Sequence, residues 1–133
     1  MNAYLSTKFE GDDNREVVES LCTAAERAGF LVTCTNRDYD EYGLRDAPDE
    51  RLTDFIFAGI EDADVVILDL TDKGVGLGIE AGYAVAVQKP LVVLYAEGAE
   101  HSPTLDELAT QTIHYHGFPD LTDQLTTLKA TLE

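Results

Sequence analysis

The sequence is poor in basic residues. Its 133 residues include nine Lys and Arg against 26 Asp and Glu, so the formal net charge is −17 at pH 7. Nucleic acids and anionic membrane surfaces are bound through Lys and Arg, so we expect neither as a partner. The acids are scattered, as on a solvated surface. Such a surplus suits a high-salt cytoplasm, where salt screens the repulsion, and equally an ordinary acidic protein.

Cysteines and long apolar runs are also scarce. The two cysteines, Cys22 and Cys34, match neither a disulfide framework nor a zinc-binding spacing, and their apolar or small neighbours predict buried free thiols. There is no apolar run of about eighteen residues and no signal-peptide pattern. We therefore expect a cytoplasmic protein.

The pattern of apolar runs and helical spacings indicates one α/β domain over residues 1–133. This length is too short for two nucleotide-binding halves. The run DVVILDL, residues 64–70, is typical of a central parallel strand that is covered on both faces. Further strands are predicted at residues 2–6, 30–34, 91–96 and 113–116, and helices at about 15–28, 49 or 53 to 61, 78–87 and 121–132.

Alternating strands and helices predict a doubly wound parallel five-stranded sheet, for which we expect the order 2-1-3-4-5. In this order the first and third strands flank the switch point, where ligands bind beyond the carboxyl ends. The stretches Tyr4 to Phe9 and Asp69 to Gly78 should meet there. Residues 35–50 read as a long polar loop, whose Tyr39 and Tyr42 would either stack on a nucleobase or pack onto the sheet.

The stretch KGVGLGIEAGYAVAVQKP, residues 73–90, places three alternate glycines, Gly74, Gly76 and Gly78, before Glu80. Glu80 is predicted in the first turn of the helix that follows. The spacing formally matches a dinucleotide-binding fingerprint, but Glu80 would then face a pyrophosphate of like charge. In a second interpretation Glu80 only complements the helix dipole, which is worth about 0.3–1 kcal/mol.

In a third interpretation Glu80 is a nucleophile. A helix N-terminus would keep its carboxylate ionised, and the glycines would leave room for a sugar. A carboxylate that attacks an anomeric carbon forms a covalent glycosyl-enzyme.

Three strings decide among these interpretations: YLSTKFEG, GIEDADVVILDL and VGLGIEAGYAVAVQKPLVVLY. Together they resemble the nucleoside 2-deoxyribosyltransferase family, including the related 2′-deoxynucleoside 5′-phosphate N-hydrolases. The resemblance implies a flavodoxin-like fold, Glu80 as the nucleophile on C1′, and Tyr4 as a residue that places or tunes it. It also implies homodimers or larger assemblies with shared sites, and neither a cofactor nor a metal.

The chain departs from the family pattern in three places. Gly74 stands where the transferases have an aspartate and the hydrolases a serine, and Ile56 aligns with the proton-handling aspartate. Asp54 lies two residues earlier, about 200° round a helix. Lys8 and Glu10 replace the Ser and Arg of the hydrolases, and Glu10 would repel a 5′-phosphate.

A proton donor for the leaving base is still needed, and Asp54, Asp69 and Asp72 are the candidates. Asp72 is equally explained as a turn residue, and Asp69 as a residue that orients loops. We expect substrate contacts from the following residues: Thr7, Lys8, Phe9, Tyr42, Asp69, Gly74, Gly76 and Gly78.

His114 and His116 would share one face of a strand, as metal ligands do, but two exposed polar residues explain them better. Two functions stay open. One is cleavage or transfer at the N-glycosidic bond of a 2′-deoxynucleoside or its monophosphate. The other is a non-catalytic nucleoside- or nucleotide-binding module.

Overall fold

The computed structural model describes residues 1–46 and 49–133. At its centre is a parallel sheet with the order β2-β1-β3-β4-β5, as predicted. The strands are β1 (Asn2–Ser6), β2 (Leu31–Cys34), β3 (Val65–Asp69), β4 (Leu91–Ala96) and β5 (Gln111–Tyr115). The carboxyl ends of β1 and β3, which are neighbours, define the switch point of the sheet.

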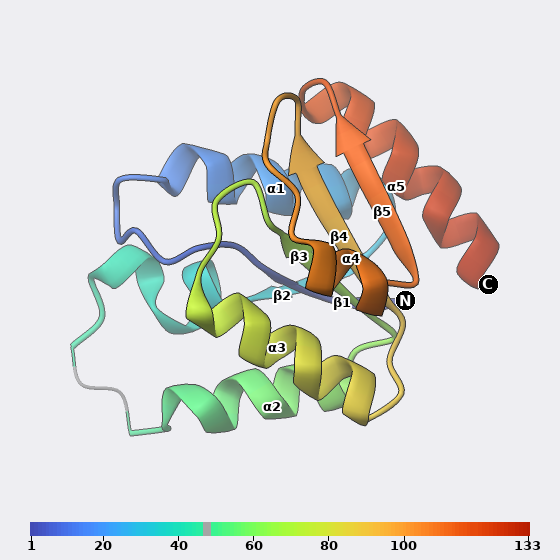
Figure 1. Cartoon of the computed structure of the whole chain (residues 1–133). Coiled ribbons are helices and arrows are strands. Elements are labelled where there is room, and N and C mark those ends of the chain that lie inside the picture. The colour runs from blue at the N-terminus through green and yellow to red at the C-terminus, as the bar shows by residue number, and fades with distance from the viewer. Residues whose placement is uncertain (47–48) are drawn as a thin grey trace.

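Helices cover both faces of the sheet (Figure 1). One face carries α1 (Arg15–Arg27) and α5 (Phe118–Leu132), which pack against each other. The opposite face carries α2 (Leu52–Asp62), α3 (Val75–Ala86) and the short α4 (Pro103–Leu108). All five residues of β3 are buried, because both faces of this strand are covered.

Helix α3 begins at Val75, three residues earlier than predicted, so Glu80 lies in its second turn and not in its first. The glycines of this stretch favour a loop in sequence terms, because glycine is a poor helix former. Burial of Leu77 and Ala81 against the sheet outweighs this preference. The dipole interpretation of Glu80 loses its basis, since the dipole effect falls off within the first turn.

Helix α4 was not predicted. Its first turn is marked by Ser102, whose side chain accepts a hydrogen bond from the Leu105 N–H, and by Pro103 in the first helical position. Helix α5 begins at Phe118, three residues before the predicted start. Cys22 and Cys34 are buried and free, as predicted.

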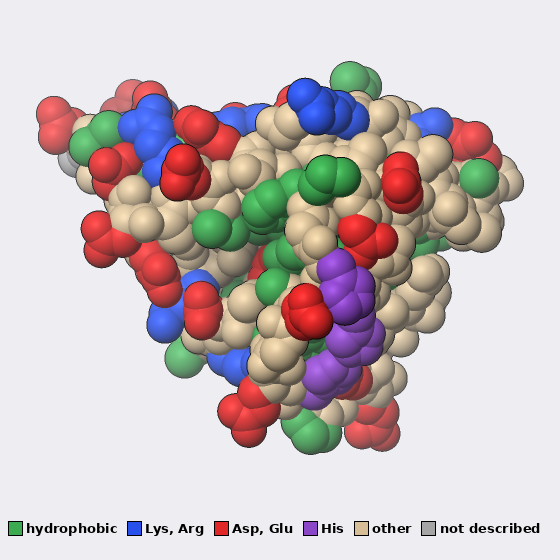
Figure 2. Space-filling view, turned by 90° about the horizontal axis from the view of Figure 1, so that it is seen from above, with side chains coloured by type: hydrophobic (Ala, Val, Ile, Leu, Met, Phe, Trp, Pro, Cys, Tyr) green, Lys and Arg blue, Asp and Glu red, His purple; other side chains and the backbone are tan. Residues whose placement is uncertain are grey.

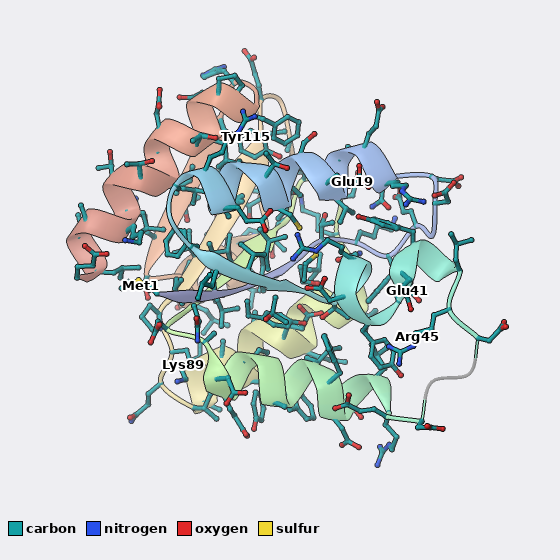
Figure 3. The ribbon with its side chains drawn as sticks, turned by 180° about the vertical axis from the view of Figure 1, so that it is seen from behind. Met1, Glu19, Glu41, Arg45, Lys89 and Tyr115 are labelled. Carbon is teal, nitrogen blue, oxygen red and sulfur yellow. The ribbon has the colours of Figure 1, made fainter. Side chains whose placement is uncertain are left out.

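The predicted loop after β2 contains two short helical turns, a π-helix η1 (Thr35–Tyr39) and a 3-10 helix η2 (Glu41–Gly43). Residues 47 and 48 of the predicted loop lie outside the described residues. Figure 3 shows Glu41 and Arg45 near the edge of the molecule opposite α5; Nε of Arg45 lies 3.7 Å from Oε2 of Glu41. Over the described ranges, the helices are all too short or too polar to cross a membrane.

Candidate active site

A small hollow lies at the switch point. Its volume is about 220 Å³, and it is lined by the end of β1 and the start of α3: Thr7, Lys8, Phe9, Gly74, Val75, Gly76, Leu77 and Glu80. The two stretches that were predicted to meet do line one hollow. Gly78 does not contribute to its lining.

Glu80 is the buried carboxylate of this hollow, with 1% of its surface exposed. Its Oε1 accepts a hydrogen bond of 3.3 Å from the Ser6 hydroxyl at the end of β1. Its Oε2 is buried and has no hydrogen-bond partner among the described residues. A buried carboxylate oxygen without a partner is energetically costly, so it is a candidate for a functional atom.

Burial raises the pKa of Glu80 from 4.5 to about 7, while the nearby hydroxyl groups of Ser6 and Tyr4 oppose part of the rise. We had expected the helix N-terminus to keep this group ionised. That expectation was wrong. Glu80 lies beyond the first turn, so the helix N-terminus does not hold its pKa down, and the loss of hydration on burial raises the pKa. A carboxyl group with a pKa near neutrality is common at functional sites.

Tyr4 lies within β1, with its ring on the same side of the sheet as α2 and α3. Its hydroxyl shares a 2.6 Å hydrogen bond with Oγ1 of Thr35, the first residue of η1. Burial and the neighbouring Glu80 raise the pKa of Tyr4 far above its usual value. Tyr4 is therefore neutral, and its hydroxyl is able to donate a hydrogen bond toward a carboxylate. The hydroxyl that hydrogen-bonds to Glu80 in the structure is that of Ser6.

Asn36, also in η1, holds the loop that follows β1. Its Oδ1 accepts a hydrogen bond from the Thr7 N–H at 3.3 Å, and its Nδ2 donates to the Thr7 carbonyl at 3.1 Å. The π-helical turn thus orients both the Tyr4 hydroxyl and the loop that lines the hollow. Such turns occur frequently at functional sites.

A second, larger hollow of about 530 Å³ adjoins the first and shares Thr7 with it. Asp69 and Asp72 both line it. Asp69 is buried and accepts hydrogen bonds from the Tyr115 hydroxyl at 2.6 Å and the Thr71 N–H at 2.8 Å. Burial raises the pKa of Asp69, and these two bonds oppose the rise. This geometry supports the alternative in which Asp69 orients the loop.

Asp54 and Tyr42 are among the predicted site residues that lie away from the two hollows. Asp54 is exposed in the first turn of α2 and lines neither hollow, while Ile56 packs in the core beside Tyr4. Tyr42 is buried in the core on the α1 side, with the Arg15 guanidinium 4.3 Å from its ring centroid. Tyr39 is buried as well and packs on Phe55 at 5.2 Å. Both tyrosines therefore follow the packing alternative.

Ser6, Thr35 and Asn36 were not identified from the sequence. Ser6 stands at the end of β1, directly before Thr7, and this position was the available signal. Thr35 and Asn36 fell in a segment that was read as a polar loop, and no residue pattern indicates a π-helical turn there.

The histidines lie together on the surface that Figure 2 shows from above. His114 contacts His101 through their Nε2 atoms, and Nδ1 of His116 lies 3.0 Å from Oε2 of Glu97. Within residues 1–46 and 49–133, no group of three or more His, Cys, Asp and Glu could hold a metal ion.

Sequence comparison gives no match to a protein-family model or to a curated protein. The solved structures with a similar fold include the following three. The CMP N-glycosidase BcmB of Clostridium botulinum matches 96% of this chain and 99% of its own, with 22% identity and a TM-score of 0.64. BlsM matches 98% of this chain and 90% of its own, with 22% identity and a TM-score of 0.74.

The third is the 2-deoxyribosyltransferase of Bacillus psychrosaccharolyticus, which matches 92% of this chain and 91% of its own. Its identity is 16% and its TM-score 0.70. These similarities establish a shared α/β fold. Function has to be argued from the site.

Proposed function

We propose that the protein breaks the N-glycosidic bond of a 2′-deoxynucleoside or its monophosphate, with Glu80 as the nucleophile. The observation that carries the proposal is Oε2 of Glu80, which is buried at the wall of the hollow and has no hydrogen-bond partner within residues 1–46 and 49–133. Its position after the glycine turn supports it, as does the fold shared with an N-glycosidase and a 2-deoxyribosyltransferase.

In the proposed reaction, the ionised Glu80 attacks C1′ through Oε2 while Ser6 holds Oε1. The electron pair of the C1′–N bond leaves with the base, which takes up a proton, and a deoxyribosyl ester of Glu80 forms. Water or a second base then attacks C1′ and releases the carboxylate. Two displacements at one carbon retain its configuration.

The proton for the leaving base is assigned to Asp72. It lies just past β3 and lines the larger hollow, which adjoins the smaller hollow of Glu80, whereas Asp54 on α2 lines neither of them. The neutral Tyr4 hydroxyl, held by Thr35, would donate a hydrogen bond to the nucleophile and orient it.

A homodimer through α3 is part of the proposal. Val75 is 85% exposed and Ile79 is 53% exposed, one helical turn apart on this helix. Apart from their own helix, the described residues place no atom within 4 Å of a Cβ added at Gly78 or Gly82, so a second backbone can approach closely. Val75 also lines the hollow, and a partner on this face would cover the mouth of the hollow.

The alternative is a binding module without catalysis. It is favoured by one observation: the described lining of the smaller hollow contains no acid besides Glu80 that could protonate a leaving base. The test is to incubate the protein with each deoxynucleoside and each monophosphate, with and without a free base, and to follow the products by chromatography. Release or exchange of the base supports the enzyme. Binding without turnover of any of them supports the module.

A further inference from the structure

We infer that the substrate of this site is an unphosphorylated 2′-deoxynucleoside and that the loop after β1 excludes a 5′-phosphate. The inference rests on the proposed function of Glu80. It selects between the two substrate classes that the proposed chemistry leaves open.

The first argument is the charge around the site. A 5′-phosphate is carried by the same sugar whose C1′ lies at Glu80, so it must lie within about one sugar ring of the smaller hollow. The adjoining hollow is strongly acidic: its lining includes Glu10, Asp13, Asp69, Asp72 and Glu97. Like charges within a Debye length of about 10 Å repel one another at moderate salt.

The second argument is that the positive charge at the site is already close to a carboxylate. Lys8 is the one Lys or Arg in the described linings of the two hollows. Its Nζ lies 3.8 Å from Oε1 of Glu10, two residues away on the same loop. A phosphate at Lys8 would therefore also be close to the Glu10 carboxylate.

The third argument is the backbone. Loops that bind phosphate present free N–H groups to the anion, often at a helix N-terminus. Here the Thr7 N–H donates to Asn36, the Asp13 N–H to the Glu10 carbonyl at 3.1 Å, and the Arg15 N–H to the Asp12 carbonyl at 3.3 Å. These three donors, between the end of β1 and the start of α1, are therefore already used within the protein.

The N-terminus of α1 reinforces this exclusion. Asp12 and Asp13 precede the helix and Glu16 lies in its first turn. These carboxylates occupy the region where the helix dipole would favour an anionic ligand. A neutral 5′-hydroxyl meets none of these obstacles and can donate a hydrogen bond to a carboxylate.

The experiment compares each 2′-deoxynucleoside with its 5′-monophosphate, by kcat/KM and by calorimetric binding, at low and high salt. We expect the wild type to prefer the nucleoside by about tenfold or more at low salt, and the preference to shrink at high salt. Glu10→Lys should reduce the preference. Glu19→Lys is the matched control, because Glu19 lies on α1 outside both hollows, and it should leave the ratio unchanged.

The outcomes separate the two proposals. A monophosphate that is turned over or bound as well as its nucleoside at low salt overturns the inference and leaves the proposed function intact. Nucleoside binding without turnover overturns the proposed function, while the binding ratio still decides the inference. Absence of binding to either ligand overturns both.

Discussion

Ser6 donates its hydroxyl to Oε1 of Glu80 over 3.3 Å, and Oε2 of the same carboxylate is buried with no hydrogen-bond partner in the described part of the chain. The two oxygens of this carboxylate therefore differ: one is held by a hydrogen bond and the other is not. The pair joins the end of β1 to the second turn of α3 across the switch point of the sheet.

Replacing Glu80 by Ala or Gln should abolish base release and leave the fold intact. Loss of the covalent route should reduce the rate by a factor of about 1,000 or more, which corresponds to about 4 kcal/mol of barrier. Product chromatography and circular dichroism on the wild type and both variants test this. A variant that retains more than about a tenth of the rate, a difference below about 1.4 kcal/mol, rules out the nucleophile.

The rate should depend on pH through Glu80. Only the ionised carboxylate attacks, so the acidic limb of the kcat/KM profile should rise with pH, with a midpoint near the Glu80 pKa of about 7. Ser6→Ala removes a hydrogen bond that lowers this pKa, so its midpoint should move to higher pH. Ser20→Ala, on α1 and outside both hollows, is the control. An unchanged midpoint in Ser6→Ala argues against the assignment.

The raised pKa of Glu80 should also make the free energy of unfolding depend on pH. The folded pKa of Glu80 lies above its ordinary value of 4.5, so the folded state binds more protons between the two values. The contribution of proton binding at Glu80 to the free energy of unfolding is complete below about pH 4.5 and is lost as the pH rises through about 7. The substituted side chain of Glu80→Gln stays uncharged at every pH. The free energy of unfolding of the variant minus that of the wild type should therefore be larger at pH 8 than at pH 5, by on the order of 2 kcal/mol. Denaturant titrations at the two pH values measure it; equal gains contradict the burial effect.

Gly59→Ala should destabilise the protein, although Ala is the better helix former by about 0.8–1.0 kcal/mol. A Cβ at Gly59 would lie 2.9 Å from Cδ2 of Tyr4, so the tyrosine ring must move. We expect a loss of about 1–3 kcal/mol, as for overpacking in a core. In a Tyr4→Ala background the obstructing atoms are gone, and the same change should become neutral or stabilising. A loss of equal size in both backgrounds would show that Tyr4 is not the cause.

The proposed dimer can be tested through the exposed side of α3. Light scattering at micromolar concentration and high salt, where repulsion between the acidic subunits is screened, should give the mass of a dimer or a larger assembly. Ile79→Glu should yield monomers and reduce activity. Leu44→Glu changes another exposed apolar side chain, 68% exposed and remote from α3 in sequence, and should leave the mass unchanged. A monomeric wild type contradicts the proposal.

The sheet could be predicted because buried parallel strands leave continuous apolar runs in the sequence, such as the one around β3. Helix α3 was placed too late, since its glycines indicate a loop and the packing of Leu77 that overrides them is a tertiary effect. Helix α4 is short and leaves too little periodicity to detect.

The site could be predicted only as far as its two meeting stretches and Glu80. The pKa of Glu80 depends on the depth of its burial, which no local pattern encodes. Ser6 and Thr35 act through single hydroxyl contacts across 74 and 31 residues of chain, and such contacts have no spacing signature. Asp54 has a suitable side chain, but the helix that carries it turns it to the solvent.

The π-helical turn at Thr35–Tyr39 bears on how this chain is compared with others. A π-turn holds its bonds one residue further apart than an α-turn, so it accommodates an extra residue without disturbing the flanking strand and helix. Residue numbers on the two sides of such a turn need not keep a constant offset between relatives. Positions from β2 to α2 are therefore matched to those of relatives by superposing coordinates and not by counting residues.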